Sequence, residues 1–593
     1  MFQMKWIWNN LKGYRVIYIL ALCITVCVQT LYLTTPIFSQ RLVDTFLTGE
    51  NALVNLETRK GYLIELLILM VATTFLRTVL QYSGNMCYET STQGMVYKIR
   101  NHLFKTIQNQ DMDYYNKYRT GDLMTRLTGD LDMVRHCMAW IIKSIVECIC
   151  LVASTSIYFL LVNWKMALCL LVVTPFIFLV TQIFKKKIRP MYVDLRERLS
   201  QMNTAAQENI SGNRVVKAFA REDYEIEKFQ DKNKDFSEAN KKTSLMWIKF
   251  MPIVDSLAES LNIVMLLCGG IFLIKGWLTM GEYIAFSGLI WTLSNPIRQF
   301  GMVINDLQRF TASSQKIIEI YYSKPSIVDS EKAVSPEERL KGEIEFKNVS
   351  FGYDDKEILH DLSFKIKAGE TVAIMGETGS GKTTLINLIP RFYDVTKGEI
   401  LVDGVNVKKY KLKELRSDIG MATQDVLLYS DTIDGNIAYG DSDMPEEEVT
   451  RCAELAAAHD FIEKLPEGYN TIIGERGVGL SGGQKQRISL ARALAIKPSV
   501  LILDDTTSAV DMETEAHIQE SLENLDFDCT KIIIAQRISS TKDADKIIIL
   551  QDGRITEMGT HDELLKNKDG YYHEVFTLQN EGFDDKTEER GND

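Results

Sequence analysis

The first half of the chain carries long apolar stretches, and the second half carries short ones. Val16–Ser39 contains no charged residue, and five further apolar stretches follow at 61–83, 140–163, 166–184, 251–274 and 281–305. A helix of about 20 residues crosses the roughly 30 Å hydrocarbon core of a bilayer. The pattern therefore predicts six membrane-spanning helices within residues 1–320, surrounded by lipid.

Two long connections separate these stretches on one side, at 84–139 and 185–250. Unstructured loops of this length are uncommon, so we expect helices that continue beyond the bilayer. Each connection has a break suited to a short crosswise helix, at Asp111–Arg126 and Ser211–Arg221. Both connections are rich in Lys and Arg, whereas the opposite loop 41–60 is charge-neutral. The bias places both termini in the cytoplasm and the chain in the cytoplasmic membrane.

The second half has the pattern of an α/β domain. After a polar linker at 321–342, Glu343–Val349 alternates like a half-buried strand. Thr371–Met375 and Ser499–Leu503 are short apolar runs, typical of buried parallel strands. We place this soluble domain at 343–578. The charged, aperiodic end at 579–593 is expected to be an irregular acidic tail.

Charge divides the 593 residues in the same way. Residues 1–320 carry 35 Lys and Arg against 26 Asp and Glu, whereas the remainder carries 32 against 53. An acidic soluble half argues against nucleic acid as a partner, because nucleic-acid binding needs phosphate neutralisation. The ten cysteines contain no CxxC pair, and most lie in apolar stretches, which favours buried reduced thiols over a disulfide framework.

A phosphate-binding loop follows the run Thr371–Met375 directly. The pattern G-x-x-x-x-G-K-[ST] is met, and Thr384 continues into a helix. Backbone N–H groups of such a loop, with the helix N-terminus, bind the phosphates of ATP. Lys382 is expected to reach the terminal phosphates, and Thr383 and Asp504 to hold Mg²⁺. The loop consists of Gly376, Glu377, Thr378, Gly379, Ser380, Gly381, Lys382 and Thr383.

A second motif stands between the loop and Asp504: Leu480-Ser481-Gly482-Gly483-Gln484-Lys485-Gln486-Arg487. It is similar to the signature of ATP-binding cassette proteins. Up to about residue 578 the whole chain resembles a half-transporter of the ATP-binding cassette exporter family. The resemblance implies an all-α six-helix transmembrane domain followed by an α/β P-loop ATPase domain with a helical subdomain.

The family resemblance also implies how the cassettes work. Two cassettes sandwich two ATP, each between the phosphate loop of one chain and the signature of a second half-transporter subunit. Ser481, Gly482, Gly483 and Gln484 would then face the partner's ATP. Ser481 and the following amides open a helix, which is an anion site in its own right.

Further residues take roles only through this resemblance. Tyr353 would stack on adenine, and Gln424 would sense Mg²⁺ and touch the membrane helices. Gly474–Gly477 is similar to a cross-linking segment, and Ser508–Asp511 to a dimer-contact loop with Val510 in place of Leu. The two breaks would be coupling helices.

Two departures from the family pattern affect catalysis. The family has a Glu after Asp504 as the general base, and here that residue is Asp505, one methylene shorter. The family has a switch His in the motif that here reads Ile534-Ala535-Gln536-Arg537. An amide donates a hydrogen bond but carries no cation and relays no proton. Together the two changes indicate a site that binds ATP and hydrolyses it slowly.

An intact signature beside a weakened catalytic pair favours a heterodimer over a homodimer. The signature serves the ATP of the partner, which would carry the Glu and the His. In a homodimer both sites would combine a sound signature with Asp505 and Gln536, so turnover would suffer twice. The homodimer remains the alternative.

The cargo is open between drug-like, lipid-like and peptide molecules. Asp255, Glu259 and Asn262 interrupt an apolar stretch, and they either face an internal cavity or pair between helices. A cavity lined by acids favours ATP-driven export of amphipathic or cationic small molecules. An ATP-gated channel or regulator would use the same parts, whereas a soluble cassette ATPase is incompatible with six spans.

Overall fold

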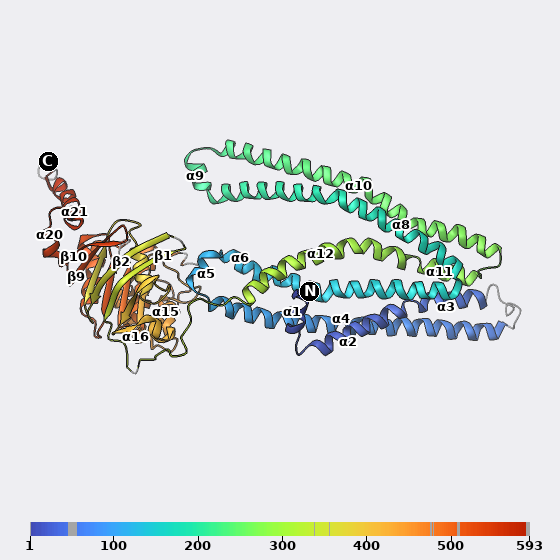
Figure 1. Cartoon of the computed structure of the whole chain (residues 1–593), viewed down its shortest axis with the longest axis horizontal. Helices are drawn as coiled ribbons and strands as arrows, with labels where there is room; N and C mark the ends of the chain where they lie inside the picture. The colour runs from blue at the N-terminus through green and yellow to red at the C-terminus, as the bar shows by residue number, and fades with distance from the viewer. Residues whose placement is uncertain are drawn as a thin grey trace. The chain divides into compact units, whose positions relative to one another are not determined.

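The computed structural model describes residues 2–45, 56–336, 338–354, 356–474, 477, 479–506 and 510–588. The chain forms two compact units. Unit 1 consists of Met1–Asn109 and Arg119–Ser323, and unit 2 consists of Gln110–Tyr118 and Lys324–Asp593. Unit 1 is helical, whereas unit 2 contains two sheets with helices around them (Figure 1).

Unit 1 consists mainly of long helices, several of which run past the length of a bilayer crossing. In Figure 1, α8 and α10 lie side by side for most of their length. The helices of unit 1 are α1 (Phe2–Asn10), α2 (Arg15–Leu31), α3 (Thr34–Val43), α4 (Leu56–Gln108), α6 (Thr120–Thr125), α7 (Leu131–His136), α8 (Ile142–Ser211), α9 (Asn213–Ala218), α10 (Glu222–Ile274), α11 (Met280–Leu289) and α12 (Trp291–Tyr321).

A break inside α8 separates two of the predicted spans. The backbone of Asn163 leaves the helical region, with φ −152° and ψ 97°. Its side-chain oxygen accepts a hydrogen bond from the Met166 N–H at 3.1 Å, which caps the helix that restarts there. Its amide also donates to the Trp277 carbonyl at 2.7 Å. The predicted stretches 140–163 and 166–184 therefore meet at an asparagine-capped turn.

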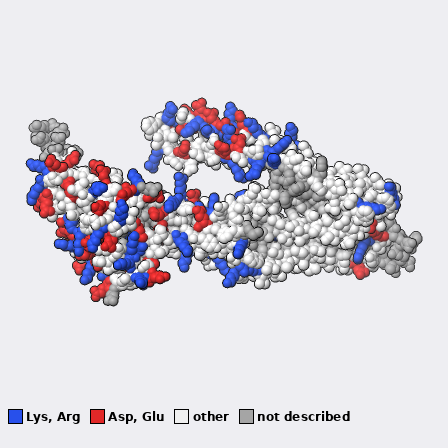
Figure 2. Space-filling view, viewed as in Figure 1, with Lys and Arg blue, Asp and Glu red and all other residues white. Residues whose placement is uncertain are grey.

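Four helical stretches in the described part of the chain are long and apolar enough to cross a membrane: Arg15–Val43, Lys60–Gln108, Thr120–Val173 and Glu222–Ile274. The predicted stretch 281–305 lies in α11 and α12, and the count of six spans stays a prediction. Figure 2 shows a broad uncharged surface over unit 1. Charged side chains gather on the parts of α8 and α10 next to α9, as expected for helices that continue into water.

Each of the two predicted breaks holds short helices as separate elements, and their crosswise orientation stays a prediction. The first break holds α5 (Met112–Lys117) and α6, which are divided at Tyr118 and Arg119, and the second holds α9. Asp111 caps α5 by accepting a hydrogen bond from the Tyr114 N–H at 3.1 Å. Because α5 belongs to unit 2 and α6 to unit 1, the chain passes between the units inside this break.

Unit 2 contains a six-stranded sheet in the order β10-β9-β3-β8-β7-β6 and an antiparallel sheet in the order β2-β1-β4-β5. In the larger sheet all neighbouring strands pair in parallel except β10 with β9. The strands are β1 (Ile344–Tyr353), β2 (Lys356–Ile366), β3 (Thr371–Met375), β4 (Lys397–Val402), β5 (Val405–Asn406), β6 (Ile419–Ala422), β7 (Val500–Asp504), β8 (Thr530–Ile534), β9 (Lys546–Gln551) and β10 (Arg554–Gly559).

Helices cover these sheets and build a separate helical layer. Apolar side chains of α15, α16 and α18 pack together with those of β6 and β7. The helices of unit 2, besides α5, are α13 (Lys382–Leu388), α14 (Leu412–Ser417), α15 (Ile433–Ile437), α16 (Glu446–Leu455), α17 (His459–Glu463), α18 (Gly482–Ala495), α19 (Met512–Glu523), α20 (His561–Leu565) and α21 (Tyr571–Glu588).

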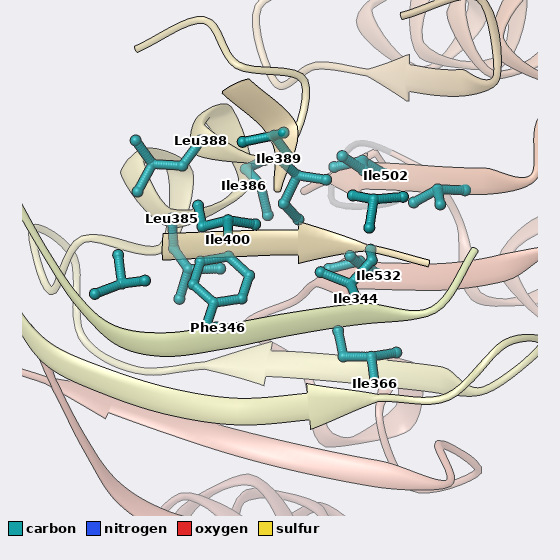
Figure 3. Close-up of a cluster of buried hydrophobic side chains, with 14 of the residues drawn as sticks. Ile344, Phe346, Ile366, Leu385, Ile386, Leu388, Ile389, Ile400, Ile502 and Ile532 are labelled. Carbon is teal, nitrogen blue, oxygen red and sulfur yellow. The ribbon is translucent and has the colours of Figure 1, made fainter. Parts of the chain in front are cut away.

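A single apolar core joins the two sheets and α13. Figure 3 shows Leu385 and Ile386 of α13 with Phe346 of β1 and Ile400 of β4. The Phe346 ring stacks on that of Phe364, with centroids 4.5 Å apart. This core anchors β3 and the start of α13, and the phosphate-binding loop lies between these two elements.

Truncating Phe346 is expected to destabilise unit 2 strongly. Phe346 is 1% exposed, and Phe→Ala in a core costs about 3–5 kcal/mol, which corresponds to a drop of roughly 10 °C in melting temperature. Thermal unfolding of the purified chain, followed by circular dichroism, measures the change. Met558→Ala, at a half-exposed position of β10, should change the melting temperature little. Equal shifts for both variants would contradict this assignment of the core.

The prediction of an irregular structure for the tail 579–593 is wrong up to Glu588. Helix α21 continues from Tyr571 to Glu588, past the proposed boundary at 579. Its first turns are anchored by packing, with Tyr572 fully buried. Once a helix is nucleated, each further residue adds a backbone hydrogen bond at little cost, so a polar sequence without periodicity can extend it.

Candidate nucleotide-binding site

The phosphate-binding loop connects β3 to α13 and depends on its glycines. Gly376, Gly379 and Gly381 all have positive φ, at +147°, +88° and +102°. A Cβ on Gly376 would collide with the Leu550 carbonyl, whereas one on Gly379 would project into open space. The space beside Gly379 is therefore open. Gly381 is the N-cap of α13 and leads directly into its first turn.

Polar groups in this loop fit a phosphate ligand. The Ser380 hydroxyl is buried and has no hydrogen-bond partner within the described ranges. The Lys382 ammonium donates to the Gly376 and Glu377 carbonyls at 2.8 and 2.7 Å. Burial lowers the pKa of Lys382, although the charges of Asp504 and Asp505 oppose this. A half-buried cation and a buried hydroxyl donor at a helix N-terminus are groups that bind phosphate oxygens.

Thr383 and Asp504 lie together as the motifs predicted. The Thr383 hydroxyl donates to Asp504 Oδ2 at 3.1 Å, across 121 positions of sequence. Asp504 is 3% exposed, and burial raises the pKa of its carboxyl, opposed by the Thr383 hydrogen bond. A hydroxyl and a carboxylate oxygen side by side fit Mg²⁺, which, when bound, neutralises phosphate charge. Thr378 and Thr384 flank this pair on the loop and on α13.

A second carboxylate, Asp505, stands at the same edge of the sheet. Its backbone is left-handed, with φ +52°, and its N–H donates to the Ile534 carbonyl at 3.1 Å. The Gln424 amide lies 3.4 Å from Asp505 Oδ2. Because Gln424 follows β6 and Asp505 follows β7, the carboxyl ends of neighbouring parallel strands bring these side chains together.

Gln536 follows β8, which lies between β3 and β7 in the sheet. Its side chain is exposed, whereas the flanking Ala535 and Ile538 are buried. The residue thus lies at the same strand-end edge as the phosphate-binding loop and Asp505. Gln486 lies in the signature motif without a predicted role, and its amide donates to the Asp505 carbonyl at 3.3 Å.

Tyr353 ends β1, on the smaller sheet. Its ring makes an edge-to-face contact with Tyr393, with centroids 5.2 Å apart. The Tyr393 hydroxyl accepts a hydrogen bond from the Asn116 amide of α5 at 3.1 Å. One tyrosine therefore joins the proposed adenine-stacking residue to the predicted first coupling helix. No local pattern singled out Asn116 or Tyr393.

The signature opens α18. Ser481 is its N-cap: Ser481 Oγ accepts from the Gln484 N–H at 3.3 Å, and Gln484 Oε1 accepts from the Ser481 N–H at 2.9 Å. This capping box leaves the Ser481 O–H as a donor, and in the first turn Gly482 is exposed and Gly483 half-buried. Glu475, Arg476, Ser508 and Ala509, of the predicted cross-linking and dimer-contact segments, lie outside the described residues.

The intramembrane acids lie on α10. The Asn262 amide donates to Glu259 Oε2 at 2.6 Å, and both side chains are exposed in the single chain. Asp255, one turn earlier, is half-buried. Their role in a cavity stays a prediction.

Comparison with known proteins identifies the family. Residues 18–297 match the family model of the ABC transporter transmembrane region, and residues 359–508 match the family model described as ABC transporter. The chain is an ABC exporter. Exporters of this family hydrolyse ATP and work as dimers in a lipid bilayer, so this exporter is a membrane protein with a partner subunit.

Relatives and solved structures cover nearly the whole exporter. A candidate multidrug export ATP-binding/permease protein of Bacillus subtilis, YgaD, is 36% identical over 92% of this chain and 94% of its own. An ATP-dependent lipid A-core flippase of Syntrophus aciditrophicus is 38% identical over 82% and 81%. A solved structure of a bacterial Atm1-family ABC exporter with ATP bound has a TM-score of 0.77 and 26% identity, over 96% and 98%.

Proposed function

We propose that this exporter moves amphipathic small molecules, drug-like or lipid-like, across the cytoplasmic membrane, and that its own ATP site hydrolyses slowly. The observation that carries the second part is the chemistry at one sheet edge. Asp505 and Gln536 stand where the family has a Glu and a His, while the phosphate-binding loop, Thr383 and Asp504 are intact. ATP would be bound by Gly376–Thr384 and stacked by Tyr353.

Asp505 is a weak substitute for a glutamate base. Its carboxylate ends one methylene nearer the backbone and lies within 3.4 Å of the Gln424 amide. Displacing a base by about 1 Å can cost on the order of a hundredfold in rate. The left-handed backbone at Asp505 suits Asp better than most residues, which supports a side chain held short of the reacting water.

Gln536 is expected to slow the same ATP hydrolysis through the loss of a proton relay. A protonated or neutral His can donate to a phosphate oxygen and also relay a proton, whereas an amide can only donate. Gln536 would therefore hold the terminal phosphate without assisting proton transfer. The expected outcome is a site that retains its ATP through several cycles of the transporter.

The intact signature supports a heterodimer. The Ser481 capping box presents the N-terminus of α18 at the surface, where it would contact ATP held by the partner. Closure of the two cassettes on ATP would be transmitted by α5, through Asn116 and Tyr393, and by α9 to the membrane helices. Hydrolysis at the partner's site would then reset the transporter.

The acids on α10 predict the cargo class. In inside-out vesicles, Glu259→Gln is expected to lower ATP-driven uptake of cationic dyes about tenfold, because one charge-assisted contact is lost. Uptake of neutral lipid analogues should change little. Glu238→Gln, an exposed position on the same helix outside the apolar stretch, is the matched control.

Two results would count against this cargo proposal. Equal losses for cationic and neutral cargo in Glu259→Gln would remove the charge argument. ATP-dependent current without uphill accumulation of any dye, lipid or peptide would favour the channel instead.

A further inference from the structure

The C-terminal helix α21 packs against β3 and β9 of the larger sheet, in a cluster that also contains Ile538 of the segment after β8. Tyr572 is fully buried, and its hydroxyl lies 2.6 Å from His561 Nδ1 of α20. Val575 and Phe576 pack against a cluster that contains Ile538. The first half of α21 is therefore anchored beside the segment Gln536–Ser540, here called the switch loop.

Gln579, two turns further along α21, holds the switch loop by its backbone. Its Nε2 donates to the Gln536 carbonyl at 2.9 Å, and its Oε1 accepts from the Ile538 N–H at 2.9 Å. One amide thus bonds the carbonyl and the N–H on either side of Arg537, as a neighbouring strand would. A double contact of this kind sets both the position and the orientation of the peptide groups next to Gln536.

Two side chains of the switch loop, those of Arg537 and Ser540, are held by a residue of α19. Glu515 of α19 is 3% exposed, lies 3.3 Å from the Arg537 guanidinium and accepts a hydrogen bond from the Ser540 hydroxyl. Helix α19 is capped by Asp511, the last residue of the predicted dimer-contact loop. The backbone is held by α21 and the neighbouring side chains by α19, while Gln536 itself is exposed.

We propose that Gln579 is a positioning residue for the nucleotide site: it holds the switch loop so that the residue at position 536 faces the terminal phosphate. The role of position 536 itself rests on the proposed function. Because the contact comes from α21, nucleotide retention depends on the C-terminal helix staying docked. A partner or truncation that displaces α21 would loosen the site without touching any residue that binds ATP.

Hydrogen exchange of the full-length chain tests the contact. Gln579→Met keeps the length and helix propensity of the side chain but loses both hydrogen bonds, so exchange of the Ile538 amide should rise about tenfold or more. Gln579→Glu keeps the acceptor for Ile538 and loses the donor, and it should give a smaller rise. Leu578→Ala, an exposed neighbour on α21, should leave this amide unchanged.

ATP retention tests the consequence. Labelled ATP should dissociate several-fold faster from the Gln579→Met chain than from the Leu578→Ala chain, both with the native Asp505 and Gln536. In a chain that also carries Asp505→Glu and Gln536→His, Gln579→Met should lower kcat several-fold at an unchanged melting temperature, and Gln579→Glu should recover part of the loss. General damage would instead lower the melting temperature and would not be relieved by Gln579→Glu.

Unchanged Ile538 exchange in Gln579→Met would overturn the proposed contact. Faster exchange with retention and kcat equal to those of Leu578→Ala would overturn its functional role. If Asp505→Glu with Gln536→His brings no gain in turnover, the slow-site proposal fails, while exchange and retention in the native chain still decide the role of Gln579.

Discussion

Replacing Asp505 by Glu and Gln536 by His together is expected to raise ATP turnover at this chain's own site about a hundredfold. The longer carboxylate would bring the base within reach of the attacking water, and the imidazole would restore a proton relay; each effect is of the order of tenfold to a hundredfold. Phosphate release from the assembled transporter, with the partner's site disabled, measures this turnover.

The single variants are the internal control for this experiment. Base and relay act on one proton transfer. Asp505→Glu alone and Gln536→His alone should therefore each raise the turnover far less than the double variant does. The left-handed backbone at position 505 penalises Glu by about 1–2 kcal/mol, less than the stability of a typical domain, so folding should survive, as a thermal melt would check. A double variant no faster than the native chain would contradict the slow-site account.

The second large effect is expected from the signature. Gly482→Asp should lower turnover at the partner's site at least a hundredfold, because a carboxylate at the start of α18 would repel the phosphate that the helix N-terminus binds. ATP retention at this chain's own site should stay unchanged. Gly482 is exposed in the first turn, so the added side chain does not disturb the core.

Lys413→Asp is the matched control, because it adds an acid to the exposed first turn of α14, away from the nucleotide site. It should leave turnover near the native value. If Gly482→Asp slowed this chain's own site and left the partner's site active, the signature would serve its own ATP and the two-subunit arrangement would be wrong.

The motifs of the nucleotide site encode local geometry, so the elements that flank it could be predicted. The phosphate-binding loop needs glycines at fixed offsets between a buried strand and a helix, and β3 and α13 flank it as expected. The Thr383–Asp504 contact could also be expected, since Thr383 opens the helix after the loop that follows β3 and Asp504 ends the parallel strand β7. The capping box at Ser481 follows from the Ser and Gln spacing.

Contacts between distant segments that carry no motif could not be predicted. Asn116 and Tyr393 are 277 positions apart, and Gln579 bonds a backbone carbonyl, which any residue at position 536 would offer. A glutamine on a polar helix face has no pattern that distinguishes it from a solvated side chain. The length of α21 was missed for the same reason, because it depends on the packing of Tyr572 rather than on the composition of residues 580–588.

The structure of the helical unit could be predicted in part. Apolar stretches located its helices, and the break at Asn163 agrees with the predicted boundary between two spans. The same stretches carry no information on which faces of α10 meet a partner, so the roles of Asp255 and Glu259 depend on transport measurements rather than on the pattern.

The most direct test of the two-subunit account is to isolate the complex from its native membranes and follow its ATP through one turnover. We predict two different polypeptides, with a photoreactive ATP analogue retained on the chain that contains Lys382 while the partner releases phosphate. A single polypeptide that turns over ATP briskly and retains none would contradict the account.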